Sequence, residues 1–83
     1  MDIDVVRKRL SIMSWRRGTK ELDLILGRFS DSNLLGLEKD ELDLYEQLLS
    51  NDDHMIYGWL FGKEKVPKNL AGLINQIQEG MYR

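Results

Sequence analysis

The sequence predicts an all-α fold, a small antiparallel bundle of about five helices in a single domain that covers residues 1–83. Three observations lead to this prediction. The apolar residues recur every three or four positions instead of alternating, only one proline occurs among 83 residues, and glycines and polar clusters divide the chain into five stretches. A chain of this length holds one hydrophobic core. Strands are not expected.

The first two helices are expected at about residues 3–15 and 19–31. The first has an apolar face at helical spacing, formed by Ile3, Val6, Leu10 and Met13. The second has a similar face, formed by Leu22, Ile25, Leu26 and Phe29. Between them, Gly18 is expected to cap the second helix, and Glu21 to reach back to a free backbone N–H.

Three further helices complete the predicted bundle. The third follows a polar break at residues 30–33, starts near Asp40 and carries an apolar stripe formed by Leu42, Tyr45, Leu48 and Leu49. Either Asp52 or Asp53 can cap a short fourth helix that stops at Gly62. Pro67 suits the first turn of a fifth helix, whose inward face is formed by Leu70, Leu73, Ile74, Ile77 and Met81.

The composition excludes several classes of protein. Because cysteine is absent, the chain has no disulfide, thiolate zinc site, iron–sulfur cluster or cysteine nucleophile. No apolar run approaches the roughly 20 residues that span a bilayer, and the first residues are acidic where a targeting segment would be basic. We therefore expect a cytoplasmic bacterial protein that is a monomer and does not insert into a membrane.

The charge is unevenly distributed along the chain. Residues 1–30 hold seven basic and four acidic side chains, whereas the formal net charge of the whole chain is −2. An acidic total argues against a dedicated nucleic-acid binder, although a local basic cluster can still meet an acidic protein surface. We therefore expect no nucleic acid among the partners.

The chain offers little for catalysis by its own residues. His54 is the only histidine, and its neighbours Asp52 and Asp53 would point in other directions on a helix, so the three do not converge as metal ligands or as a proton relay. No nucleotide-binding glycine motif, HExxH motif or calcium loop is present. We predict no catalytic residue, no metal site and no stably bound cofactor, and hence a protein that is not an enzyme.

Most aromatic residues fall at helical spacings and are expected in the core, Trp59 among them. Trp15 is different because it stands at a helix end. There it is either a lid over the core or part of a docking surface.

The most informative stretch runs from Trp15 to Asp23. Its plain interpretation is a helix end, a glycine turn and an acidic first turn. That interpretation leaves two arginines beside a helix amino terminus, where positive charge is unfavourable. We therefore take this turn as the candidate partner-binding site and expect the side chains of Arg17 and Glu21 at its surface; the candidate residues are Arg16, Arg17, Gly18, Glu21 and Asp23.

Residues 17–23 resemble the RGxxE-LD signature of the succinate dehydrogenase assembly factor family, the bacterial flavinylation factors. A second block is also similar, with Leu48-Leu49 and Asp52-Asp53 followed by Trp59-Leu60 and Pro67. The two blocks cover most of the chain. The resemblance implies a five-helix bundle that binds the flavoprotein subunit of succinate dehydrogenase, and also that of fumarate reductase, and promotes covalent attachment of FAD to a histidine of that subunit. FAD is then the partner's cofactor.

The chain departs from the family pattern at the start of the third helix. Family members often have serine or threonine as the cap, whereas this chain has Leu37-Glu38, which we expect to be a poorer cap.

Two other functions stay open at this level. One is a small helical adaptor that regulates a different enzyme through one exposed face. The other is a nucleic-acid-associated protein that uses the basic residues of the first 20 positions.

The sequence also leaves the role of Gly18 open. The glycine either adopts a positive φ or lets a partner approach its backbone. We expect the second cause, so that Gly18→Ala would melt near the parent temperature. We likewise expect Arg17→Ala and Glu21→Ala to leave the fold intact.

Overall fold

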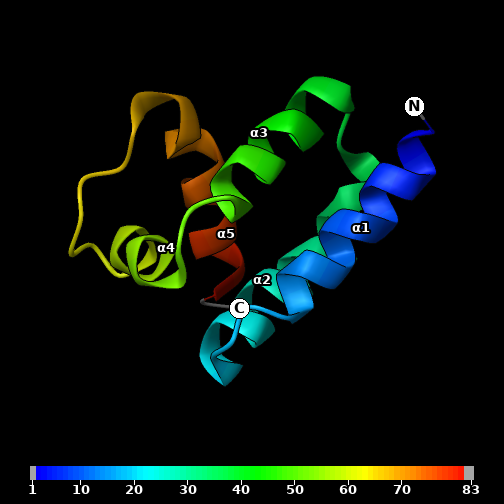
Figure 1. The fold of residues 1–83 in the computed structure, drawn as a ribbon. Coiled ribbons are helices and arrows are strands. Elements are labelled where there is room, and N and C mark those ends of the chain that lie inside the picture. Colours follow the sequence, from blue (N-terminus) through cyan, green and yellow to red (C-terminus); the bar gives the residue numbers. More distant parts are fainter. Residues whose placement is uncertain (1, 82–83) are drawn as a thin grey trace.

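The first two helices, α1 (Ile3–Trp15) and α2 (Lys20–Asn33), run antiparallel and pack against each other (Figure 1). In this computed structural model, which describes residues 2–81, three more helices follow: α3 (Lys39–Leu49), α4 (Asp53–Leu60) and α5 (Ala71–Met81). Short 3-10 turns precede α3 and α5, at Leu34–Gly36 and Lys68–Leu70. Residues 2–81 contain no strand, so the predicted all-α bundle of about five helices is confirmed.

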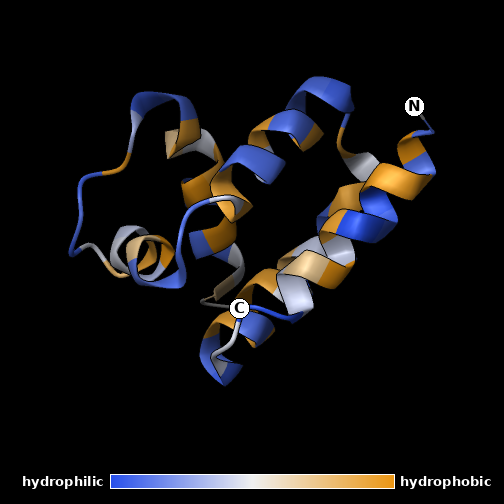
Figure 2. Cartoon of the chain, viewed as in Figure 1, coloured by the Kyte–Doolittle hydropathy of each residue, from blue (hydrophilic) through white to orange (hydrophobic). Residues whose placement is uncertain are grey.

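The core forms where the apolar faces of the five helices meet (Figure 2). Each helix contributes at least one side chain that is fully buried or nearly so: Leu10, Leu26, Tyr45, Ile56 and Ile77. Trp59 is only 4% exposed, so its predicted place in the core is confirmed. Each large apolar side chain contributes about 1.5 to 3 kcal/mol when buried, and this packing stabilises a chain without disulfides.

The observed α1 has the predicted bounds, whereas α2 continues two residues beyond the predicted end. The polar cluster at residues 30–33 predicted a break, but two of its side chains bond to the helix itself. The Ser30 hydroxyl donates to the Gly27 carbonyl at 2.9 Å, and the Asn33 amide donates to the Phe29 carbonyl at 2.9 Å. Because these side chains bond to carbonyls of the last turns, α2 extends to Asn33.

The expectation of a poor cap for α3 was wrong. Glu38 is the N-cap residue, and its backbone N–H donates to Glu41 Oε1 at 3.1 Å, as in a capping box. Glu41 is the third residue of α3, and its carboxylate accepts the hydrogen bond of the Glu38 N–H. The start of α3 is therefore stabilised by the carboxylate of Glu41.

The start of α4 agrees with one of the two caps that the sequence left open, whereas α5 begins later than predicted. Of the two aspartates before α4, Asp52 is the cap, and its carboxylate accepts from the Met55 N–H at 2.9 Å. Asp53 is therefore free for another interaction. Pro67 lies before the 3-10 turn Lys68–Leu70, so it precedes α5 and is not in its first turn. Within the described residues, no helix is both long and apolar enough to span a bilayer.

Candidate functional site

The turn between α1 and α2 has two features that fix its path. Gly18 has φ +110°, which side-chain-bearing residues rarely adopt. Thr19 then caps α2, with its hydroxyl accepting from the Leu22 N–H at 3.3 Å. The predicted cap, Gly18, was therefore wrong by one residue, because only a side-chain oxygen can accept this bond.

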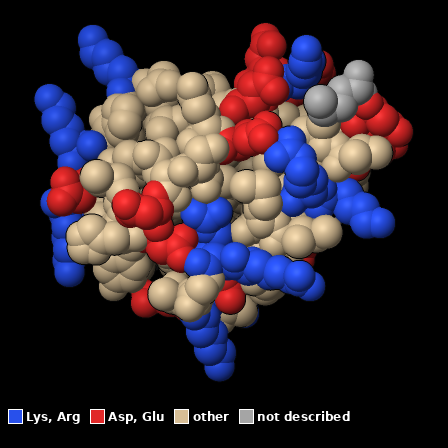
Figure 3. Space-filling model, viewed as in Figure 1, with Lys and Arg blue, Asp and Glu red and all other residues tan. Residues whose placement is uncertain are grey.

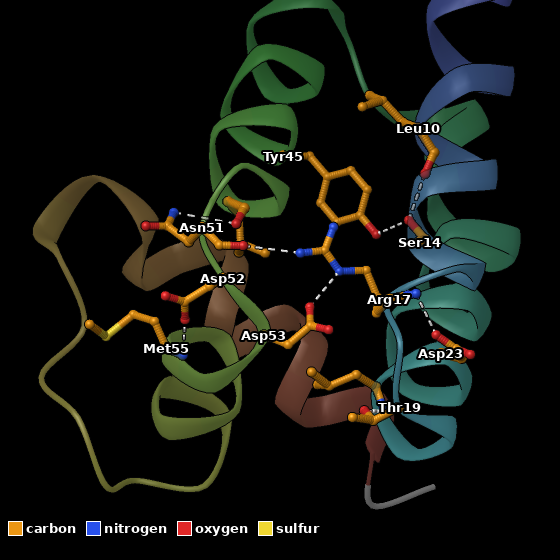
Figure 4. A network of polar contacts seen from close by, with 12 residues as sticks. Leu10, Ser14, Arg17, Thr19, Asp23, Tyr45, Asn51, Asp52, Asp53 and Met55 are labelled. Atoms are coloured by element: carbon orange, nitrogen blue, oxygen red, sulfur yellow. Dashed lines mark hydrogen bonds and ion pairs between the residues drawn. The ribbon is translucent and has the colours of Figure 1, made fainter.

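Asp23 holds this turn from the first part of α2. Its Oδ1 accepts a hydrogen bond from the backbone N–H of Arg17 at 2.6 Å (Figure 4). Asp23 is half-buried, so this bond is sheltered from water. The charged acceptor makes it a strong hydrogen bond.

The Arg17 side chain points into the molecule, toward the start of α4 (Figure 4). Its Nε donates to Asp53 Oδ1 at 2.9 Å, and its Nη2 donates to the Asn51 carbonyl at 3.0 Å. The side chain is only 10% exposed. The expectation that Arg17 lies at the surface of the turn was therefore wrong, because the guanidinium finds its acceptors inside the molecule and not in solvent.

Tyr45 of α3 extends the polar network toward α1. Its hydroxyl forms a hydrogen bond with Ser14 Oγ, and Ser14 in turn donates to the Leu10 carbonyl at 2.7 Å (Figure 4). Burial raises the pKa of Tyr45 to about 12, while the Ser14 hydrogen bond and the positive charge of Arg17 oppose that rise. No buried side-chain nitrogen or oxygen in the described part of the chain lacks a hydrogen-bond partner.

The raised pKa of Tyr45 predicts a loss of stability at alkaline pH. Between about pH 10 and pH 12 the unfolded chain releases the phenol proton while the folded chain keeps it, so the free energy of unfolding falls as pH rises. The expected loss is about 2 to 3 kcal/mol. Urea unfolding at several pH values would measure it. Tyr45→Phe should lack this part of the pH dependence; an identical pH profile in this variant would contradict the assignment.

Trp15, the last residue of α1, packs against α2. Its ring lies against Gly27 of α2, where a Cβ atom would overlap the indole, and its Nε1 donates to Asp31 Oδ1 at 3.2 Å. The ring is half-buried against α2, and Trp15 is not among the side chains that pack against the core. Gly27 therefore allows the two helices to approach closely at this point.

The exposed part of the turn includes the remaining candidate residues. Arg16 and Glu21 are both exposed, and within residues 2–81 neither side chain forms a hydrogen bond or an ion pair. The predicted surface position of Glu21 is confirmed. Lys and Arg side chains project over α1 and around its carboxyl end, with Asp and Glu side chains beside them (Figure 3). In the described part of the chain, no group of three His, Asp or Glu side chains could hold a metal ion.

Comparison with known proteins places this arrangement in a family. Residues 8–81 match the family described as the flavinator of succinate dehydrogenase. The chain belongs to this family. It is 47% identical over 57 residues to succinate dehydrogenase assembly factor 2, mitochondrial, of Debaryomyces hansenii, covering 69% of this chain and 40% of that protein. It is also 35% identical over 63 residues to FAD assembly factor SdhE of Legionella pneumophila strain Lens, covering 76% of this chain and 80% of that protein.

A third relative, FAD assembly factor SdhE of Coxiella burnetii, is 43% identical over 47 residues, which make up 57% of each chain. The matched segment therefore spans most of the Legionella relative but less than half of the yeast one. The resemblance inferred from residues 17–23 and from the second block is confirmed.

The sequence analysis named these candidate residues together, as one partner-binding group. The structure divides them: Arg16 and Glu21 face solvent, whereas the side chain of Arg17 and that of Asp23 hold the turn from within. The sequence analysis missed Asp53 as a member of this group. One signal was available, since two consecutive aspartates precede α4 and a helix needs only one cap.

The geometry of Gly18 reverses the expectation for Gly18→Ala. A Cβ would lie 3.5 Å from Asp53 Oδ2, an ordinary contact, but the φ of +110° strains any residue other than glycine. We expect the variant to lose about 1 kcal/mol or more of unfolding free energy. The matched control is Gly72→Ala in α5, where a Cβ meets nothing within 4 Å, and that variant should melt at or above the parent temperature. Equal melting temperatures for Gly18→Ala and the parent would contradict this account.

Proposed function

We propose that this chain binds the flavoprotein subunit of succinate dehydrogenase and promotes covalent attachment of FAD to it. Family membership over residues 8–81 supports this proposal, because the family is described as the flavinator of that enzyme. We extend the proposal to the flavoprotein subunit of fumarate reductase. FAD is the cofactor of the partner, and this chain holds none stably.

One observation favours the α1–α2 turn as the contact surface: its backbone is fixed from inside the molecule, while the side chain of Glu21 is exposed. The backbone of the turn is fixed by the Asp23 hydrogen bond, the Gly18 conformation and the Thr19 cap. Glu21 emerges from this fixed backbone into solvent. Because the backbone beneath Glu21 is already fixed, binding has to order its side chain but not the loop, so less of the interaction energy is lost.

Docking would promote the reaction by positioning. The covalent bond forms between a histidine of the partner and the flavin, and this chain contributes no atom to it. Holding the FAD-binding region of the partner in a reactive arrangement can lower the barrier by several kcal/mol, since well-oriented groups avoid the entropy cost of finding each other. Arg16 and Glu21 are the side chains that we propose to make direct contacts. We further propose that the chain acts as a monomer in the cytoplasm.

A reconstituted reaction tests this function. The flavoprotein subunit, produced without covalent flavin, is incubated with FAD in the presence or absence of this chain, and covalent flavin is read as in-gel fluorescence after denaturation. The proposal predicts faster attachment or a higher yield when the chain is present. Equal rates and yields would contradict it. Recovery of a different enzyme with the tagged chain, and no flavoprotein, would favour the adaptor function instead.

A further inference from the structure

An ion pair joins two turns that lie far apart in the sequence. Arg17, between α1 and α2, donates from Nε to Asp53 Oδ1 at 2.9 Å, and from Nη2 to the Asn51 carbonyl at 3.0 Å. Asn51 lies between α3 and α4, and Asp53 is the first residue of α4. One guanidinium therefore holds both the backbone and a side chain of the second turn.

The setting of this pair differs from that of the ion pair between Arg9 and Glu46. Arg9 and Glu46 join α1 and α3 at 2.7 Å, with side chains 45% and 37% exposed. In the Arg17 pair the side chains are 10% and 27% exposed. Sheltering two charges from water has a desolvation cost that offsets much of their attraction, so such a pair is weak evidence for a gain in stability. A pair of this kind can instead select one arrangement of the two segments that it joins.

The pair acts on the backbone that carries the candidate contact residues. The N–H of Arg17 is held by Asp23, and its side chain by Asp53 and Asn51, so the residue is fixed at both ends. The Asp53 carboxylate also lies beneath Gly18, since its Oδ2 is 3.5 Å from the position of a Gly18 Cβ. The α3–α4 turn therefore supports the peptide that leads to Glu21.

We propose that Asp53, together with the Asn51 carbonyl, is a positioning residue for the partner-binding turn. In this arrangement the Arg17 side chain bonds inside the molecule and does not contact the partner. This inference rests on the proposed function. Asp53 itself need not touch the partner. Its carboxylate fixes the guanidinium, the guanidinium fixes residue 17, and residues 18–21 are thereby presented in the conformation that binds.

A double-mutant cycle tests the inference through binding. Affinity for the flavoprotein subunit is measured by titration, well below all melting temperatures, for Arg17→Ala, Asp53→Ala and the double variant. We expect each single variant to bind about tenfold more weakly and the double variant to bind no worse than either, because both remove the same support. If Arg17→Ala weakens binding far more than Asp53→Ala and the two effects add, Arg17 contacts the partner directly and the inference is overturned.

Three further variants separate positioning from loss of stability. Asp53→Asn keeps one acceptor oxygen and the side-chain shape, so it should fold even if Asp53→Ala does not and should bind with an intermediate affinity. Ile74→Val lowers stability from within the core, since Ile74 is 2% exposed, and should keep parent affinity. Glu46→Ala removes the acidic member of the exposed pair and should also keep parent affinity. Weakened binding in the last two variants would show that any destabilisation suffices and would overturn the inference.

Hydrogen exchange tests the same support without any partner. In Asp53→Ala the amide of Arg17, which donates to Asp23, should exchange about tenfold faster, while amides in the middle of α5 keep their parent rates. Unchanged exchange at Arg17 would overturn the inference by itself. If the Arg17 amide exchanges faster in Asp53→Ala but the parent chain does not bind the flavoprotein subunit, Asp53 does hold the turn in place and only the proposed function fails.

Discussion

Trp59→Ala is expected to lower the free energy of unfolding by about 3 to 5 kcal/mol. The ring is 4% exposed and belongs to the cluster in which the five helices meet, so its removal leaves a cavity that the neighbouring side chains fill only in part. A domain of this size has a total stability of about 5 to 15 kcal/mol. The variant should therefore melt far below the parent and fall close to the limit of folding at 37 °C.

Thermal and urea unfolding of both proteins would measure this effect. Leu35→Ala is the matched control, because it also removes a large apolar side chain, but one that is 84% exposed. That control should change stability by no more than about 0.5 kcal/mol. Equal melting temperatures of Trp59→Ala and the parent would contradict the burial of the ring.

Glu21→Ala is expected to have the opposite profile, with normal stability and lost function. Glu21 is exposed in the first turn of α2 and forms no hydrogen bond or ion pair within the described residues, so only a favourable interaction with the helix dipole is removed. If Glu21 is a central contact with the flavoprotein subunit, its removal should weaken binding by about 30-fold or more, the usual effect of a binding hot spot.

Asp40→Ala provides the control for Glu21→Ala. Asp40 is the second residue of α3, as Glu21 is the second residue of α2, and it is also exposed. Both variants lose one negative charge at the same place in a helix, so both should show the same small change in melting temperature. Only Glu21→Ala should lose affinity and flavin attachment. Equal losses in the two variants would show that binding depends on the net charge of the chain and not on the position of Glu21.

Helical periodicity was sufficient to predict the fold. Apolar residues three or four positions apart mark the buried face of each helix, and the observed α1 has the predicted bounds. Errors arose where a side chain could bond in more than one way. Ser30 and Asn33 looked like a break but bond within α2, and Glu38 looked like a poor cap until Glu41 supplied the acceptor.

The site was predicted less completely because its organisation is tertiary. Residues 16–23 stood out through local charge and a glycine, which are properties of a short segment. The partner of Arg17 lies 36 residues away, and no local pattern indicates which of two neighbouring aspartates faces a distant arginine. An arginine that is unfavourable beside its own helix end was therefore interpreted as a binding residue, although Asp53 already compensates its charge.

We propose that the α1–α2 turn is the surface that meets the flavoprotein subunit. Titration of the unlabelled subunit into the ¹⁵N-labelled chain, followed by amide resonances, maps that surface residue by residue. We expect the resonances of Arg16, Gly18, Thr19 and Glu21 to shift or broaden first, while those of the exposed residues Val5 and Leu35 stay in place. A footprint confined to Val5 and Leu35, with the turn unaffected, would contradict it.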